Sequence, residues 1–170
     1  MFERNKIEHR KIIPIIAEIF EQTCKTFQLS PDKQVLFAKW FIVCAIVRSN
    51  LDPNYQTAKS AGVFDIPNHV FDEMKIRLNL ESNVSGGDFR NHIRASLEYF
   101  KWAMKKFRKK FDDDVELLKC VFLTLDLGYY KVEKTLDTIG HPVSFGVAAS
   151  MIEDDFAVEK IVEMIAIMSL

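Results

Sequence analysis

Glycine, proline and cysteine are scarce in this chain, and their scarcity limits which folds and which redox environments are possible. Six glycines and five prolines in 170 residues leave little material for long irregular loops. The three cysteines, Cys24, Cys44 and Cys120, are an odd number with no close pair. A disulfide framework and a CxxC metal or redox motif are therefore excluded. We expect a cytoplasmic protein with buried, reduced thiols.

Long hydrophobic runs are also missing. The most apolar segment, Val35–Val47, is short and contains Lys39, whereas a membrane-spanning helix needs about 20 apolar residues. The start of the chain, Met1–Lys11, is dense in charge and unlike a secretory leader. We therefore expect no transmembrane segment, and we expect the apolar segment to form a helix at the centre of the fold.

No large excess of either charge is present, since the net charge is −1 at pH 7. The molecule as a whole is therefore not drawn towards nucleic acid or anionic membranes, and electrostatic recognition must use charges segregated on part of its surface. The composition, 48% hydrophobic and 28% charged, is typical of a folded globular protein. We expect residues 1–170 to form one domain, because the chain is too short for two comfortable cores.

Helix signals, in contrast, are frequent, and strand signals are nearly absent. Ser30-Pro31 and Asp52-Pro53 are typical helix starts, Gly62 is a natural terminator, and Pro14 predicts a split or kink in the first helix. Helices are predicted over about 5–28, 31–50, from 53 to Gly62, from Asp65-Pro67 to Leu78, over 89–111, from Asp112-Asp113-Asp114 past Gly128 to Ile139, and as one or two helices in 143–170, with a loop at 81–88. The fold class predicted is all-α, a single-domain helical bundle of about six to eight helices with a central apolar helix near Val35–Val47.

The strongest single pattern is an apolar stripe with a period of three or four residues. It consists of Phe89, Ile93, Leu97, Phe100, Met104, Phe107 and Phe111. On a helix that turns 100° per residue, these side chains share one face, which must be buried.

The opposite side of the same segment is rich in basic residues. One flank and the position opposite the stripe supply the predicted partner-binding residues, Arg90, Arg94, Lys101, Trp102, Lys105, Arg108 and Lys109. Cations can pair with carboxylates or phosphates, and tryptophan can stack on a partner's side chain or on a base. The competing interpretation is a solvated face with Trp102 packed under a neighbour. If Asp112–Asp114 and Glu116 pair with these basic residues, the positive electrostatic field of this side becomes weaker.

A second candidate is the region around Gly62. Ala58, then Gly62-Val63, then Asp65 resembles the helix-turn-helix of DNA-binding regulators, with the element spanning 53–79. The resemblance implies DNA binding, but Asn68 stands where that family has a buried aliphatic residue. Acidic residues also fall on the helix that would enter the groove, namely Asp72 and Glu73.

Motifs for catalysis are missing. His9, His69, His92 and His141 are scattered without metal-ligand spacing, and no phosphate-binding loop is present. Glu153-Asp154-Asp155 is interpreted as a helix start or a solvated surface. We predict no catalytic, cofactor-binding or metal-binding residue and no cofactor.

The chain's last segment, Ile161–Leu170, is apolar on more than one face. Either it inserts between other helices, or it leaves an apolar patch that pairs with another molecule, including a second copy.

The leading functional prediction is a non-catalytic protein-interaction module, such as an adaptor, an inhibitor or an immunity-type protein, whose partner has an acidic surface. It uses the basic helix face, the apolar C-terminal helix, or both. The alternatives are nucleic-acid binding through 89–111 with the element at 53–79, and a small helical enzyme with a dispersed site.

Overall fold

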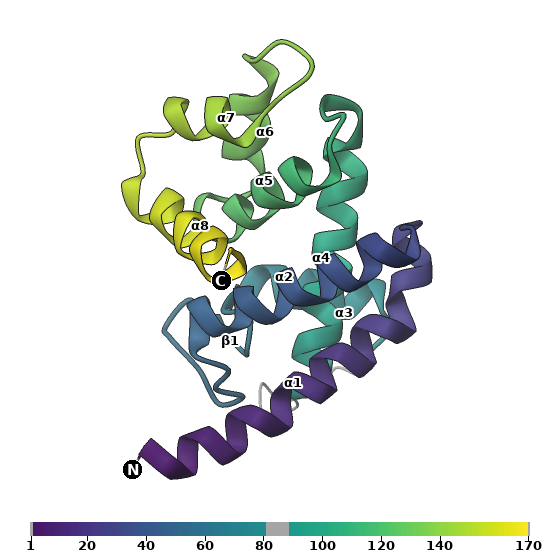
Figure 1. Ribbon diagram of the computed structural model, residues 1–170, viewed down its shortest axis with the longest axis vertical. Coiled ribbons are helices and arrows are strands. Elements are labelled where there is room, and N and C mark those ends of the chain that lie inside the picture. The colour runs from purple at the N-terminus through teal and green to yellow at the C-terminus, as the bar shows by residue number, and fades with distance from the viewer. Residues whose placement is uncertain (1, 81–88, 170) are drawn as a thin grey trace. The chain divides into compact units, whose positions relative to one another are not determined.

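The protein is built almost entirely of helices (Figure 1), as a computed structural model describes it for residues 2–80 and 89–169, with side chains from residue 11 onward. Within these ranges the helices are α1 (Phe2–Cys24), α2 (Pro31–Ser49), α3 (Asn68–Arg77), α4 (Phe89–Phe107), α5 (Asp114–Leu127), α6 (Tyr129–Asp137), α7 (Phe145–Met151) and α8 (Asp155–Met168). Short 3₁₀ turns follow α1 and α4, at Lys25–Phe27 and Arg108–Lys110, and the strands are β1 (Ser60–Ala61) and β2 (Ile66–Pro67). The all-α prediction is confirmed. The loop predicted at 81–88 lies outside the described residues.

Residue contacts group the chain into two compact units. The N-terminal unit comprises Met1–Tyr99 with Ile167–Leu170, and the C-terminal unit comprises Phe100–Ala166. Helix α4 contributes its first half to the N-terminal unit and its second half to the C-terminal unit. That the whole chain is one domain stays a prediction.

The core of the N-terminal unit forms between α1 and α2. Helix α2 begins at Pro31, directly after Ser30, as the start signal predicted, and Asn50 follows its last residue, Ser49, in the left-handed conformation. Phe20 and Phe41 lie in ring contact at 5.3 Å, which fastens the two helices together. Of the split or kink predicted at Pro14, the split does not occur, because α1 runs without interruption from Phe2 to Cys24.

The Val35–Val47 segment lies in α2 and is buried along one broad side. Phe37, Trp40 and Phe41 are at most 4% exposed, whereas Val35 is 59% exposed. The apolar character of this segment therefore supplies much of the core of the N-terminal unit but also leaves one large aliphatic side chain at the surface.

The region after α2 differs from the prediction. No helix forms between Asp52-Pro53 and Gly62; instead β1 pairs antiparallel with β2, with Ala61 opposite Ile66. Gly62 stands between the strands at φ +82°, a conformation that favours glycine. The helix predicted here is wrong, and the helix-turn-helix resemblance fails with it, because only its second helix, α3, exists.

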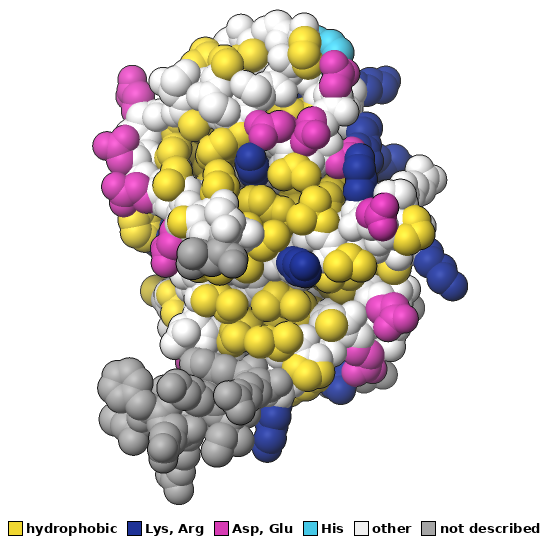
Figure 2. Space-filling view, viewed as in Figure 1, with side chains coloured by type: hydrophobic (Ala, Val, Ile, Leu, Met, Phe, Trp, Pro, Cys, Tyr) yellow, Lys and Arg dark blue, Asp and Glu magenta, His cyan; other side chains and the backbone are white. Residues whose placement is uncertain are grey.

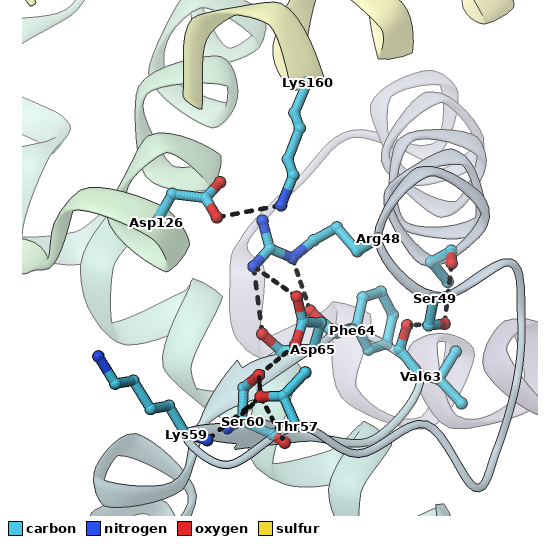
Figure 3. A network of polar contacts seen from close by, with 11 residues as sticks. Arg48, Ser49, Thr57, Lys59, Ser60, Val63, Phe64, Asp65, Asp126 and Lys160 are labelled. Carbon is cyan, nitrogen blue, oxygen red and sulfur yellow. Dashed lines mark hydrogen bonds and ion pairs between the residues drawn. The ribbon is translucent and has the colours of Figure 1, made fainter. Parts of the chain in front are cut away.

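A buried arginine explains why this region forms a hairpin (Figure 3). Arg48 Nε donates to the carbonyl of Phe64 at 2.8 Å, and its Nη2 contacts the Asp65 carboxylate at 3.4 Å. Asp65 also accepts a hydrogen bond from the Ser60 hydroxyl. The helix predicted to begin at Asp65-Pro67 begins at Asn68, directly after Pro67, and the Asp65 side chain instead connects the hairpin to α2.

The C-terminal unit contains the second half of α4 and the helices α5 to α8. Asp113 caps α5 by accepting hydrogen bonds from the amides of Val115 and Glu116 at 2.8 and 2.9 Å, as its position predicted. The helix predicted to run past Gly128 is instead two helices. Gly128 adopts φ +81° and ψ 150°, a region that side chains strongly disfavour, and the chain turns there into α6.

All three cysteines are buried, including Cys24, whose exposure the sequence leaves open. Among the described residues, none of the helices combines the length and the apolar character that a bilayer span requires.

Candidate functional site

The apolar stripe of α4 is buried, as predicted. Ile93, Leu97, Phe100, Met104 and Phe107 are each at most 4% exposed. Phe89 is half-buried. The helix ends at Phe107 rather than near Phe111, and Phe111 follows the 3₁₀ turn in an extended conformation while staying buried.

In the first half of α4, the side opposite the apolar stripe is buried as well as the stripe itself. Asn91 and Ala95 lie almost opposite Ile93 on the helical wheel, and both are buried. Arg90 and Arg94 are exposed beside them, and Arg90 lies 3.7 Å from Glu18 of α1 in an exposed ion pair. This half of the helix therefore presents two separate cations rather than an open outer face.

The second half of α4 does present an open outer face. Trp102 is half-buried, and exposed Lys105, Lys106 and Lys109 follow it by three, four and seven residues, which places them on the same side. None of these three lysines forms an ion pair within the described part of the chain. In Figure 2, basic side chains gather at the upper right, over the end of α4. Lys101 is half-buried at the edge of this face.

Aromatic side chains of α6 extend this face. The ring of Tyr129 lies 4.6 Å from Trp102 and is stacked parallel to Phe107 at 5.0 Å. Tyr130 meets the Tyr129 ring edge-on at 5.4 Å and is 82% exposed. Trp102 is thus neither covered nor fully exposed: one side rests on Tyr129, which holds it in place.

The hydroxyl of Tyr129 is held as a donor. It donates to Glu133 at 2.9 Å, and burial together with this carboxylate raises the pKa of Tyr129 well above its usual value. The phenol therefore stays neutral at ordinary pH, and its ring orientation is fixed by contacts on both α4 and α6.

We call Trp102, Lys105, Lys106, Lys109, Tyr129 and Tyr130 the basic–aromatic face. All six belong to the C-terminal unit. Sequence reasoning placed Trp102, Lys105 and Lys109 in a binding surface but left out the two tyrosines and Lys106. The available signal was the Gly128-Tyr129-Tyr130 run, where a glycine breaks the helix and two bulky aromatics follow.

The acidic residues after α4 pair with only some of the basic residues at its end. Arg108 pairs with Asp114, as predicted for the local acids. The others have different partners: Asp112 lies 3.1 Å from His141, Glu116 pairs with Lys119 at 2.8 Å, and Asp113 caps α5. Lys110 pairs with the more distant Asp137 of α6. Local pairing therefore leaves the three outer lysines of the basic–aromatic face unmatched within the described residues.

The C-terminal helix is buried on one side only, and pairing of its exposed apolar residues with another molecule stays a prediction. Helix α8 buries Ala157, Ile161 and Met164, but Phe156 is 64% exposed and Val162 is 54% exposed. Asp154 accepts a hydrogen bond from the amide of Ala157 at 3.2 Å, which fits the predicted helix start at Glu153-Asp154-Asp155.

The described histidines and Cys120 lie in different environments. His92 is buried and stacks on Phe71 with ring centroids 3.9 Å apart, whereas His69 and His141 are exposed. Burial raises the pKa of the Cys120 thiol to about 12, helped by the charge of Glu116, so the nucleophilic thiolate is disfavoured. Across 11–80 and 89–169, no three His, Cys, Asp or Glu side chains are grouped so as to hold a metal ion. The side chain of His9 lies outside the described residues.

Comparison with protein-family models, with curated proteins and with solved structures finds no match for this chain.

Proposed function

We propose that this chain is a protein-interaction module that binds an acidic segment of a partner protein through the basic–aromatic face. The observation that carries the proposal is the combination of three exposed lysines with an aromatic group that is held rigid but still accessible. Lys105, Lys106 and Lys109 lie on the same side of the helix as Trp102, and the ring of Tyr129 contacts that of Trp102 at 4.6 Å.

The energetics favour such a face for protein binding. Each exposed ion pair contributes only about 0–1 kcal/mol, so lysines alone give weak attraction. Tryptophan and tyrosine are enriched among the residues that dominate interface energies, because they bury a large area with few rotatable bonds. Trp102 and Tyr130 would supply this apolar contact, and the lysines would select an acidic partner.

Nucleic acid is the alternative occupant, since cations beside aromatic rings also bind single strands. A protein is favoured because the anions of an acidic helix are spaced, whereas those of a nucleic acid are continuous. Long-range attraction of a polyanion needs a large positive net charge, and the net charge of this chain is −1. Glu133 and Asp137 of α6 lie close to Tyr129 and would repel a strand that carries a charge on every nucleotide, whereas a helix with carboxylates one turn apart can place them at the lysines alone.

A direct test is a titration of the protein with a fluorescently labelled acidic helical peptide that repeats Glu at every fourth position beside Leu and Phe. Changing Lys105→Glu together with Lys109→Glu should weaken binding by roughly tenfold or more, because two pairs are lost and replaced by repulsion. Trp102→Ala should weaken it as well, without changing the charge. The matched control is Lys25→Glu with Lys59→Glu, two exposed lysines of the N-terminal unit.

The same titration with an oligothymidylate strand at two salt concentrations addresses the alternative. Tighter binding of the strand than of the peptide, with a steep loss in higher salt, would replace our proposal with nucleic-acid binding. Equal peptide binding by the face variant and the control variant would reject the basic–aromatic face as the docking surface.

A further inference from the structure

The exposed side of α8 carries a charge pattern that complements the basic–aromatic face. Asp155, Glu159 and Glu163 follow one another at intervals of four residues, and all three are exposed. Residues at this interval lie in one row along a helix, about 6 Å apart. None of the three forms an ion pair within the described residues.

The second half of α4 has the corresponding basic row. Lys101, Lys105 and Lys109 also follow one another at intervals of four residues, the last of them in the 3₁₀ turn that continues α4. Both rows span about 12 Å, so three acids and three cations can meet in register. Within one chain, Lys105 and Lys109 bring like charges together, as do Glu159 and Glu163, which is mildly unfavourable, and opposite charges from outside relieve it.

Apolar side chains accompany both rows. Trp102 directly follows the first lysine of the basic row, and Phe156 directly follows the first acid of the acidic row. Phe156 is 64% exposed, and Val162 adds a second exposed apolar group on α8. Each row therefore has an exposed or half-exposed apolar residue beside it, which is the composition of a small interface with an apolar centre and a charged rim.

We propose that the partner of the basic–aromatic face is α8 of a second copy of this chain. The inference rests on the proposed function, since it names the acidic segment that the face binds. The second half of α4 and α8 lie apart in the C-terminal unit, with α5 between them in Figure 1, so one copy can use both surfaces at once.

This geometry makes the contact head-to-tail. The two surfaces that meet are different, so each added copy uses one surface and exposes the other. The assembly therefore always has one unused surface of each kind, and it grows until it closes into a ring. One helix docking on one face covers less than the roughly 800 Å² per partner of a stable complex. The association is therefore reversible and concentration-dependent, and it weakens with salt because both rows are exposed.

The test is sedimentation velocity of the full chain over a range of concentrations, at low and at high salt. The wild-type protein should sediment faster as concentration rises at low salt, and high salt should remove the effect. Lys105→Glu with Lys109→Glu, and separately Glu159→Lys with Glu163→Lys, should each stay monomeric. Far-ultraviolet circular dichroism and thermal unfolding verify that both variants are folded.

Mixing the two variants is the decisive step. The Glu159→Lys, Glu163→Lys variant keeps its basic row, and the Lys105→Glu, Lys109→Glu variant keeps its acidic row. An equimolar mixture should therefore recover association that neither variant shows alone. The control, Lys25→Glu with Lys59→Glu, should associate like the wild type. The inference is overturned by a wild-type protein that is monomeric at every concentration, by a variant that associates like the wild type, or by a mixture that stays monomeric.

Failure here is distinguishable from failure of the proposed function. A monomeric wild-type protein that still binds the acidic peptide through Lys105 and Lys109 rejects the second copy as partner and leaves the docking face in place. Loss of both results rejects the docking face itself.

Discussion

Replacing Gly62 by alanine should destabilise the protein for two separate reasons. At φ +82° a residue with a side chain is strained, which costs about 1–2 kcal/mol. The added Cβ would also lie 2.7 Å from His92 Nδ1 and 2.9 Å from its Cγ, closer than real contacts allow. His92 cannot move aside easily, because it is buried and stacked on Phe71. Such overpacking costs about 1–3 kcal/mol, so the total expected loss is about 2–5 kcal/mol.

Urea unfolding of four proteins measures both contributions: wild type, Gly62→Ala, His92→Ala and the double variant. If the added Cβ clashes with the His92 ring, Gly62→Ala should lower the free energy of unfolding by at least about 1 kcal/mol less in the His92→Ala background than in the wild type. Gly128→Ala is the control, because its backbone is also strained at φ +81° but nothing lies within 4 Å of the added Cβ. A coupling below about 0.5 kcal/mol would refute the close approach of the hairpin to α4.

Three further outcomes follow from the buried and capping groups. Arg48→Met should lower the free energy of unfolding by about 3 kcal/mol or more, because the Asp65 carboxylate would lose its buried cation; urea unfolding measures this, and a loss below about 1 kcal/mol would contradict it. Asp113→Ala should cost about 1 kcal/mol through loss of the α5 cap, whereas an unchanged midpoint would show that the cap is dispensable. The raised pKa of Cys120 means that the folded protein keeps a proton which the unfolded chain releases, so stability should fall between pH 9 and about 12; Cys120→Ala should flatten this slope, and equal slopes would reject the assignment.

Most helices were predictable because their signals are local. Ser30-Pro31 starts α2 and Asp113 caps α5 through backbone geometry that depends only on neighbouring residues. The apolar stripe of α4 likewise predicted its buried face, since a period of three or four residues has one structural meaning.

The segment from Asp52 to Pro67 was not predictable in the same way. Asp52-Pro53 has the residues of a helix start, but the hairpin is held by Arg48, which reaches its carbonyls and carboxylate from α2. Gly62 fits a helix terminator as well as a hairpin turn, and its close approach to His92 is a contact that the local sequence does not reveal. Contacts between distant residues therefore overrode the local pattern.

The candidate site was half predictable for a related reason. The helical wheel correctly placed Lys105 and Lys109 on an outer face, but it could not show that the same side of the helix is buried at Asn91 and Ala95, about three or four turns before Lys105. Nor could it bring Tyr129 of α6 against Trp102, because that contact depends on the turn at Gly128.

The most direct test of the central claim is the intrinsic fluorescence of Trp102 during titration with the acidic helical peptide. Trp40 is buried in the N-terminal unit, so a Trp40→Phe variant, verified as folded by far-ultraviolet circular dichroism, leaves Trp102 as the single tryptophan reporter. Our account predicts a saturable shift of the emission that disappears when Lys105 and Lys109 are both changed to Glu. Saturable peptide binding that leaves the Trp102 emission unchanged would contradict it, because the peptide would then be docking elsewhere on the molecule.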